Sequence, residues 1–274
     1  MGKINFILFF ATLLVFTYCK KDSKTHTVEP EPTPIIQPIP AVTPTVTPGP
    51  GNPHQLVISF KAMVNNQVLV PNTKFYTNKS QDNFSITKFN YYISNVQLTK
   101  EDGTIFAEKE SYHLIKHVGG STSFTIVNLP EGNYKNVRFL IGVDSLRNVS
   151  GAQTGALDVL NDMFWEWNSG YIFFKMEGSY NTTATPTIGD YAIHIGGFSG
   201  PLKCLQTCSF NLSSPIVSKK DKVSTLSYNT VIDEIFVNPN YIDFETYYAA
   251  VNTKTFKQIS DNYKDMFVVE KVEN

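Results

Sequence analysis

His194 lies in the segment whose residue types best fit a metal site. In a strand over residues 191–195, the tyrosine and the two isoleucines share one face and His194 takes the other. The small residues Ala192 and Gly196 leave that second face open. An imidazole in this position can bind a transition metal or can simply be hydrogen-bonded, and the spacing alone fits both interpretations.

A second candidate site is the segment of residues 163–171, which reads Met-Phe-Trp-Glu-Trp-Asn-Ser-Gly-Tyr. Both tryptophans of the chain, Trp165 and Trp167, fall within it, shortly after Met163. Aromatic side chains bury large apolar areas, so core packing explains this segment as well as ligand binding does. The segment therefore marks a candidate site without identifying its chemistry.

Cys204 and Cys208 are the cysteines of the later part of the chain. A disulfide is the usual state in an exported protein, but four residues of straight strand span about 13 Å, so a bond requires a turn between them. Two buried thiols or a pair of soft-metal ligands are the alternatives. His113 and His117 have the same spacing, too long for one metal on a straight strand, and we expect both at the surface.

The start of the chain has the residue order of a secretory signal. Lys3 precedes an apolar run over residues 4–15, which is too short to span a membrane. The run stops just before Cys19, as in the lipobox of bacterial lipoproteins, although Tyr18 stands where a small residue is usual. We predict a signal peptide over residues 1–18 and acyl chains on Cys19 that anchor the protein to the outer membrane, facing the periplasm or the outside. An ordinary signal peptide cut elsewhere is the alternative.

A proline-rich segment follows the cysteine. Nine of the 15 prolines fall within residues 24–53, interleaved with Thr, Val and Ile. Proline-rich chain is stiff and extended, at about 3.1 Å per residue, and does not form a packed core. We therefore predict a tether over residues 19–54 and a folded domain over residues 55–274.

Within the domain, apolar residues mostly recur with period two, which predicts β-strands. The alternation slips by one residue near Ser94 and Asn95, which predicts a β-bulge, and Asp102-Gly103 predicts a hairpin. Residues 156–162 form the best short helix, and the tail over residues 244–267 mixes strand and helix signals. Later strands are expected at residues 171–176, 191–195, 208–212 and 231–237. The pattern predicts an all-β fold, an antiparallel β-sandwich with short helical insertions.

The composition excludes several functional classes. The chain has 274 residues, of which 42% are hydrophobic and 17% charged, enough to bury a core. Its net charge of −1 provides no basic excess for a phosphate backbone, so we expect no nucleic-acid partner. It has no glycine-rich phosphate loop, no G-x-S-x-G elbow and no H-E-x-x-H pair. Since no set of nucleophile, base and orienting group can be assembled, we expect no enzyme.

Four segments together resemble a known family. They are Phe89-x-Tyr91-Tyr92-Ile93-Ser94-Asn95-Val96, then Gly132-x-Tyr134 leading to Phe139-x-Ile141-Gly142-Val143-Asp144, then Met163-x-Trp165-x-Trp167-x-Ser169-Gly170-Tyr171, and His194-x-Gly196. In this order they are similar to the MbnP-like family of exported copper-binding proteins, associated with methanobactin. The resemblance covers about residues 56–269, and its tryptophan segment is the most specific part. Cys19 followed by Lys-Lys-Asp and a Pro-Thr tether is similar to lipoproteins of the Bacteroidota.

The resemblance implies a β-sandwich that binds copper outside the cytoplasm. It also implies that a partner di-haem oxidase converts Trp165 or Trp167 to kynurenine to complete the metal site, with His194 as a ligand. Some relatives have a histidine shortly after the Gly-Val pair, whereas residues 144–148 of this chain contain none. A Cu(I) site could instead recruit the soft sulfur atoms of Met163, Cys204 and Cys208.

Two functions from different classes follow. The first is a non-catalytic, membrane-anchored lipoprotein that captures or buffers copper through His194, the tryptophan segment and Met163. The second is a cell-surface display or adhesion module that binds a glycan or a protein without metal. The family resemblance favours the first function, and the scarcity of histidines favours the second.

Overall fold

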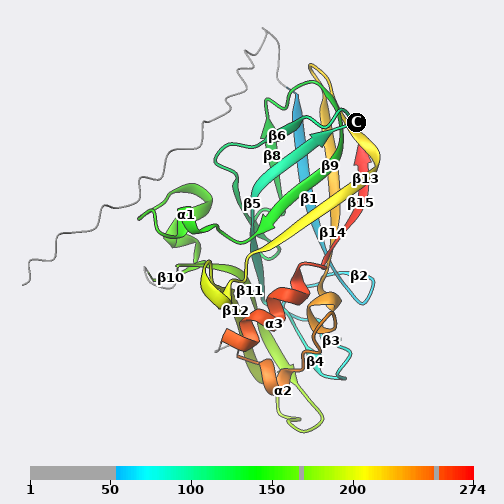
Figure 1. The fold of residues 1–274 in the computed structure, drawn as a ribbon. Coiled ribbons are helices and arrows are strands. Elements are labelled where there is room, and N and C mark those ends of the chain that lie inside the picture. The colour runs from blue at the N-terminus through cyan, green and yellow to red at the C-terminus, as the bar shows by residue number, and fades with distance from the viewer. Residues whose placement is uncertain (1–53, 167–169, 250–252) are drawn as a thin grey trace, which may run out of the picture. The chain divides into compact units, whose positions relative to one another are not determined.

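The computed structural model describes residues 54–166, 170–249 and 253–274 (Figure 1). The predicted signal peptide, the predicted lipidation site Cys19, residues 20–53 of the predicted tether and Trp167 lie outside the described residues. None of the helices in the described ranges is long and apolar enough to cross a membrane. His54, at the end of the expected tether, is buried and its Nε2 lies 3.2 Å from Ser224 Oγ.

The smaller of the two main sheets is built around the first strand. Its strand order is β15-β14-β1-β2, and β8 also pairs with β1. The pairing of β1 with β14 is parallel, whereas the other pairings in this sheet are antiparallel. The strands are β1 (Gln55–Val64), β2 (Gln67–Val68), β8 (Ser123–Val127), β14 (Val223–Val231) and β15 (Phe267–Glu273).

The larger sheet carries the candidate site. Its main path is β13-β9-β5-β11-β4-β3, with β10 and β12 paired to β11, and β6 and β7 paired to β5. These strands are β3 (Tyr76–Thr77), β4 (Asn83–Phe84), β5 (Lys88–Lys100), β6 (Ile105–Ala107), β7 (Tyr112–Lys116), β9 (Gly132–Ile141), β10 (Phe164–Glu166), β11 (Gly170–Asn181), β12 (Gly189–Gly196) and β13 (Gln206–Ser218).

The core lies between the two sheets. Phe60 on β1 makes edge-on contacts with Tyr91 on β5 and Phe139 on β9, at centroid distances of 6.0 and 6.4 Å. Alternate residues of β1 are buried, as period two requires. The prediction of an all-β sandwich with short helical insertions is confirmed.

Two local predictions in the sequence are also confirmed. The pairing of β5 with β9 shifts register between Ser94 and Gln97, and Asn95 has a φ of 53°. The apolar residues on both sides of this bulge are fully buried, so the extra residue keeps one face of β5 inward. The Asp102-Gly103 turn joins β5 to β6, and Lys100 N donates to Thr104 O at 2.8 Å.

Two other local predictions need correction. The short helix expected over residues 156–162 is divided into two 3-10 helices, η1 (Gly155–Leu157) and η2 (Val159–Asn161), because Asp158 between them has extended backbone. Residues 231–237 were expected as a strand, yet η4 (Ile232–Phe236) is a 3-10 helix. Its buried residues are Ile232, Ile235 and Phe236, which have helical spacing rather than period two.

The tail forms both helix and strand, as its mixed sequence pattern predicts. It forms α2 (Phe244–Tyr247) and α3 (Thr253–Tyr263) and ends in β15. Ile259 and Tyr263 of α3 are fully buried. Helix α3 lies close to β12 and to η4, so it covers the end of the sheet that carries His194 (Figure 1). The remaining short elements are α1 (Ser145–Asn148) and η3 (Gly200–Leu202).

Candidate functional site

His194 has the position on β12 that the alternation predicts. Tyr191, Ile193 and Ile195 are buried in the core, while His194 is half-buried on the opposite face. Its Nε2 lies 2.7 Å from Glu177 Oε1 on the neighbouring strand β11. Among the described residues, no hydrogen-bond partner faces the other ring nitrogen, Nδ1. The lone pair of that nitrogen is therefore available to bind a metal ion.

Trp165 covers the same face of β12 two residues further along. A Cβ atom built on Gly196 would lie 2.6 Å from Trp165 Cζ3, so the indole rests directly on the glycine backbone. Phe256 of α3 stacks against this indole with a centroid distance of 5.8 Å. The sequence suggested that the second face of β12 is open at Gly196. In the structure Trp165 covers it there. Because residues two apart on a strand share a face, the indole of Trp165 lies over the position next to His194 on that face.

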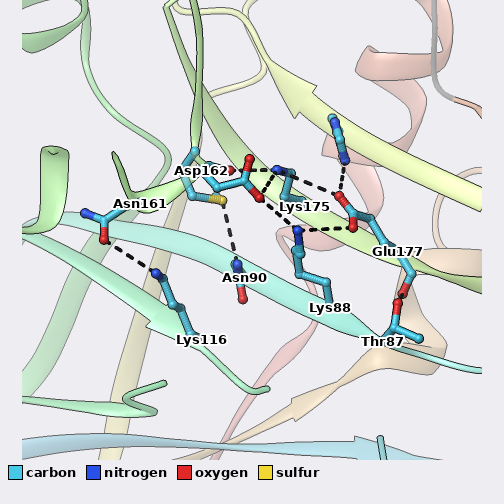
Figure 2. A network of polar contacts seen from close by, with 10 residues as sticks. Thr87, Lys88, Asn90, Lys116, Asn161, Asp162, Lys175 and Glu177 are labelled. Atoms are coloured by element: carbon cyan, nitrogen blue, oxygen red, sulfur yellow. Dashed lines mark hydrogen bonds and ion pairs between the residues drawn. The ribbon is translucent and has the colours of Figure 1, made fainter. Parts of the chain in front are cut away.

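A network of ion pairs surrounds the carboxylate that contacts His194 (Figure 2). Lys88 Nζ lies 3.2 Å from Glu177 and 2.8 Å from Asp162. Lys175 Nζ lies 3.7 Å from Glu177 and 2.9 Å from the same oxygen of Asp162. It also donates to the backbone oxygen of Asp162 at 2.6 Å. The network thus connects β5, β11 and β12 to the residue that precedes Met163.

These contacts shift the pKa values of Glu177, His194 and Asp162. Burial alone raises the pKa of Glu177, but the hydrogen bond from His194 and the nearby Lys88 outweigh it, and the pKa is lowered. Burial lowers the pKa of His194 despite the contact with Glu177. An ionised carboxylate only accepts hydrogen bonds, so Nε2 of the neutral imidazole carries the proton and Nδ1 presents its lone pair. The two lysines lower the pKa of Asp162 to about 2, against the effect of burial.

Met163 lies in the core rather than beside His194. Its side chain is fully buried, and its sulfur accepts a weak hydrogen bond from Asn90 Nδ2 at 4.0 Å. Asn90 Oδ1 is buried without a partner among the described residues. Among the described residues no hydrogen bond joins Met163 to His194, and Met163 belongs to the core, whereas Trp165 packs on Gly196 beside His194 on β12.

The comparison with protein families agrees with this architecture. A sequence model described as MbnP matches residues 53–256, about three quarters of the chain. The chain belongs to the MbnP family. The solved structure of MbnP from Methylosinus trichosporium is similar at 13% identity, with a TM-score of 0.42 and coverage of 64% of this chain and 75% of that one. No curated protein matches the chain.

The MbnP segments of this chain meet in space. Asn148 of α1 donates to the backbone oxygens of Val143 and Asp144, and its Oδ1 accepts from Tyr171 N at 2.9 Å. Gly170 has a φ of +75°, and a Cβ there would lie 2.2 Å from Asn148 Oδ1. Only glycine fits this position, which explains the Ser-Gly-Tyr end of the tryptophan segment.

The two cysteines do not form a disulfide in this MbnP-family domain. Cys204 and Cys208 are both buried thiols. The backbone oxygen of Cys204 accepts a hydrogen bond from Tyr263, and Cys208 Sγ donates to Lys264 O at 3.3 Å. Each cysteine thus packs against the C-terminal end of α3, and burial raises the pKa of both thiols, that of Cys208 to about 12.

The expectation of surface positions for His113 and His117 is wrong. His113 is half-buried, stacks on Phe124 at 3.6 Å and lies 2.8 Å from Glu108. His117 stacks on Phe89 and its Nε2 lies 3.0 Å from the hydroxyl group of Tyr91. These aromatic contacts come from distant strands, and the spacing of the two histidines gives no sign of them.

Sequence reasoning missed the four charged residues around His194, namely Lys88, Asp162, Lys175 and Glu177. One of them carries a readable signal. Lys175 interrupts the continuous apolar run from residue 171 to 176, and a lysine inside a buried strand must find counter-charges. Among the described residues, no group of three or more His, Cys, Asp or Glu side chains is placed to hold a metal ion.

Proposed function

We propose that this MbnP-family protein is a non-catalytic, exported lipoprotein that binds copper for capture or buffering. In this proposal Cys19 carries the lipid anchor, which holds the domain at the outer membrane, and His194 is a copper ligand. Trp165 or Trp167, oxidised to kynurenine by a di-haem partner enzyme, completes the site. The family membership and the geometry around His194 support the proposal.

The hydrogen bond between His194 and Glu177 is the observation that carries it. Metal-binding histidines usually donate their second ring N–H to a carboxylate, which fixes the tautomer and increases the basicity of the binding nitrogen. His194 has this arrangement: Nε2 contacts Glu177 at 2.7 Å, and Nδ1 has no partner among the described residues. The neutral imidazole, beside the indole of Trp165, fits the preference of copper for nitrogen donors.

The test is the copper content of the full chain, purified from membranes in detergent and reconstituted with Cu(I). We expect near-stoichiometric copper in the wild type and loss of copper in His194→Ala. Glu177→Gln should weaken binding about 10- to 100-fold, the usual cost of losing such a partner. His113→Ala is the matched control, because His113 also contacts a carboxylate at 2.8 Å but stacks on Phe124 instead of lying beside Trp165. Retention of copper by His194→Ala would exclude His194 as a ligand.

The same samples test the modification and the anchor. Peptide mass spectrometry over residues 163–171 of protein from its own host should show one oxidised tryptophan and identify it as Trp165 or Trp167. Mass spectrometry of the N-terminal peptide should show acyl chains on Cys19, and Cys19→Ser should release the protein from the membrane fraction. An intact N-terminal peptide without lipid would contradict the anchor.

The alternative function, surface display or adhesion without metal, has its own support in the structure. The carboxylates near His194 are already paired with two lysines, and the described residues contain no group of three metal-binding side chains. Absence of copper after reconstitution, together with two unmodified tryptophans, would favour this function. Trp165, which is 37% exposed, would then be the first residue to test for stacking on a glycan.

A further inference from the structure

Four charged side chains beside His194 form a closed ring in which cations and anions alternate (Figure 2). Each of the two ammonium groups, on Lys88 and Lys175, lies between the carboxylates of Asp162 and Glu177, at distances from 2.8 to 3.7 Å. Two positive charges offset two negative charges, so the ring has no net charge. In this cluster, Nδ1 of His194 is the nitrogen for which the described residues provide no hydrogen-bond partner, because Nε2 faces Glu177.

We propose that Lys88 and Lys175 determine the metal selectivity of the site by acting as built-in cations. They occupy the space between two carboxylates in which a hard divalent cation would bind. Carboxylate oxygens are the ligands that magnesium, calcium and manganese prefer, whereas nitrogen and sulfur donors suit copper. With both carboxylates committed to ammonium groups, the cluster offers a metal the nitrogen of His194 and excludes hard divalent ions.

The burial of Lys175 keeps this arrangement in place. Its side chain is 4% exposed, and its ammonium group contacts a carboxylate oxygen and the backbone oxygen of Asp162 as well as Glu177. To bind both carboxylates, an incoming cation would have to break the contacts of this buried ammonium group with Asp162 and Glu177 together. Lys88 is 33% exposed and Asp162 is 66% exposed, so the ring meets solvent through these two residues.

This inference rests on the proposed function only in naming copper as the metal that the site admits, and its test uses a different metal. The full chain is titrated with Mn²⁺, which prefers oxygen ligands and is followed by electron paramagnetic resonance. We expect wild-type protein to bind Mn²⁺ weakly. Lys175→Met keeps an unbranched side chain, one atom shorter, and removes the charge. This variant should bind Mn²⁺ at least tenfold more tightly, because attraction between opposite charges at this distance is large in a partly buried site.

Three further variants make the result specific. Lys61→Met is the matched control, because Lys61 also pairs with a carboxylate, that of Glu270, but lies on β1 of the other sheet; it should leave Mn²⁺ binding unchanged. The double variant Lys175→Met with Glu177→Gln should lose the gained binding. Lys88→Met should show a smaller gain in Mn²⁺ affinity. If circular dichroism shows that Lys175→Met does not fold, the Mn²⁺ affinity of Lys88→Met tests the inference in its place.

The outcomes separate this inference from the proposed function. Folded lysine variants that bind Mn²⁺ no more tightly than wild type would overturn the inference, as would a gain that survives Glu177→Gln. Tight binding of Mn²⁺ by the wild type at His194 would also overturn it. Failure of the wild type to bind copper would refute the proposed function alone, because the comparison of Mn²⁺ binding between lysine variants does not involve copper.

Discussion

Replacing Gly196 by alanine should displace Trp165 from β12. The added Cβ would lie 2.6 Å from Trp165 Cζ3 and 2.6 Å from the backbone oxygen of Tyr171, both well inside contact distance. The indole could tilt away only by disturbing its stack on Phe256. The oxygen of Tyr171 belongs to β11, which is paired on both sides and cannot yield easily. The substitution therefore affects both the backbone and the candidate site.

Gly189→Ala on the same strand is the control for the loss of stability expected in Gly196→Ala. Its Cβ would lie 3.4 Å from Tyr180 Cε1, an ordinary contact. Overpacking costs about 1–3 kcal/mol, whereas glycine to alanine in compatible backbone stabilises by about 0.4–1 kcal/mol through the unfolded state. We expect Gly196→Ala to lower the free energy of unfolding by about 1–3 kcal/mol, or the melting temperature by roughly 2–12 °C for a domain of this size. Gly189→Ala should be neutral or slightly stabilising.

Urea denaturation measures the stability, and tryptophan fluorescence in a Trp167→Phe background reports on Trp165 alone. Gly196→Ala should shift the emission of Trp165 to longer wavelength, because the indole moves into solvent, and Gly189→Ala should not. An unchanged free energy of unfolding together with an unchanged Trp165 spectrum in Gly196→Ala would refute the packing of the indole on the glycine, and with it the shared face of Trp165 and His194.

Two further predictions concern buried titratable groups. Burial lowers the pKa of His117 from its ordinary value of 6.5 to about 4, so the unfolded chain binds more protons between these values and stability should fall as the pH drops through that window. His117→Gln should flatten this part of the stability profile in urea melts from pH 7 to 4, and an unaltered profile would contradict the shift. Burial raises the pKa of Cys204 and Cys208, so iodoacetamide should modify neither thiol in native protein at pH 8 and both in urea. A native mass two hydrogens lighter than the reduced chain would show a disulfide instead.

The sequence predicts strands well where apolar residues alone form the buried face. In β5 and β12 the alternate positions are Val, Ile, Leu, Phe or Tyr, and both strands lie where the pattern indicates. β14 was missed because its buried face includes polar residues: Ser224 and Thr230 are fully buried beside Leu226 and Tyr228. Thr230 is satisfied by the hydroxyl of Tyr91 at 3.0 Å. A period-two search cannot count such residues as core, because their partners lie on distant strands.

In the candidate site, too, one part could be predicted from the sequence and another part could not. The position of His194 opposite the buried residues of β12 follows from local alternation and could be predicted. Its partner Glu177 is 17 residues away, and the pairing of β11 with β12 sets which residue faces His194. Asp162 reaches the ring only because it has left-handed backbone at the end of η2. Each of these contacts depends on strand register and turn geometry, which the local sequence around His194 does not determine.

In the proposed copper site, the ring would account for selectivity at a single imidazole. A histidine beside free carboxylates would attract any divalent cation, since unpaired negative charge is not specific. Pairing Glu177 with Lys88 and Lys175 removes that general attraction, yet Glu177 still accepts the proton of His194 Nε2. Under the proposal, Glu177 orients His194 without binding the metal itself. Selectivity would then come from the charges that the two lysines already neutralise, and the lysines would belong to the site together with the histidine.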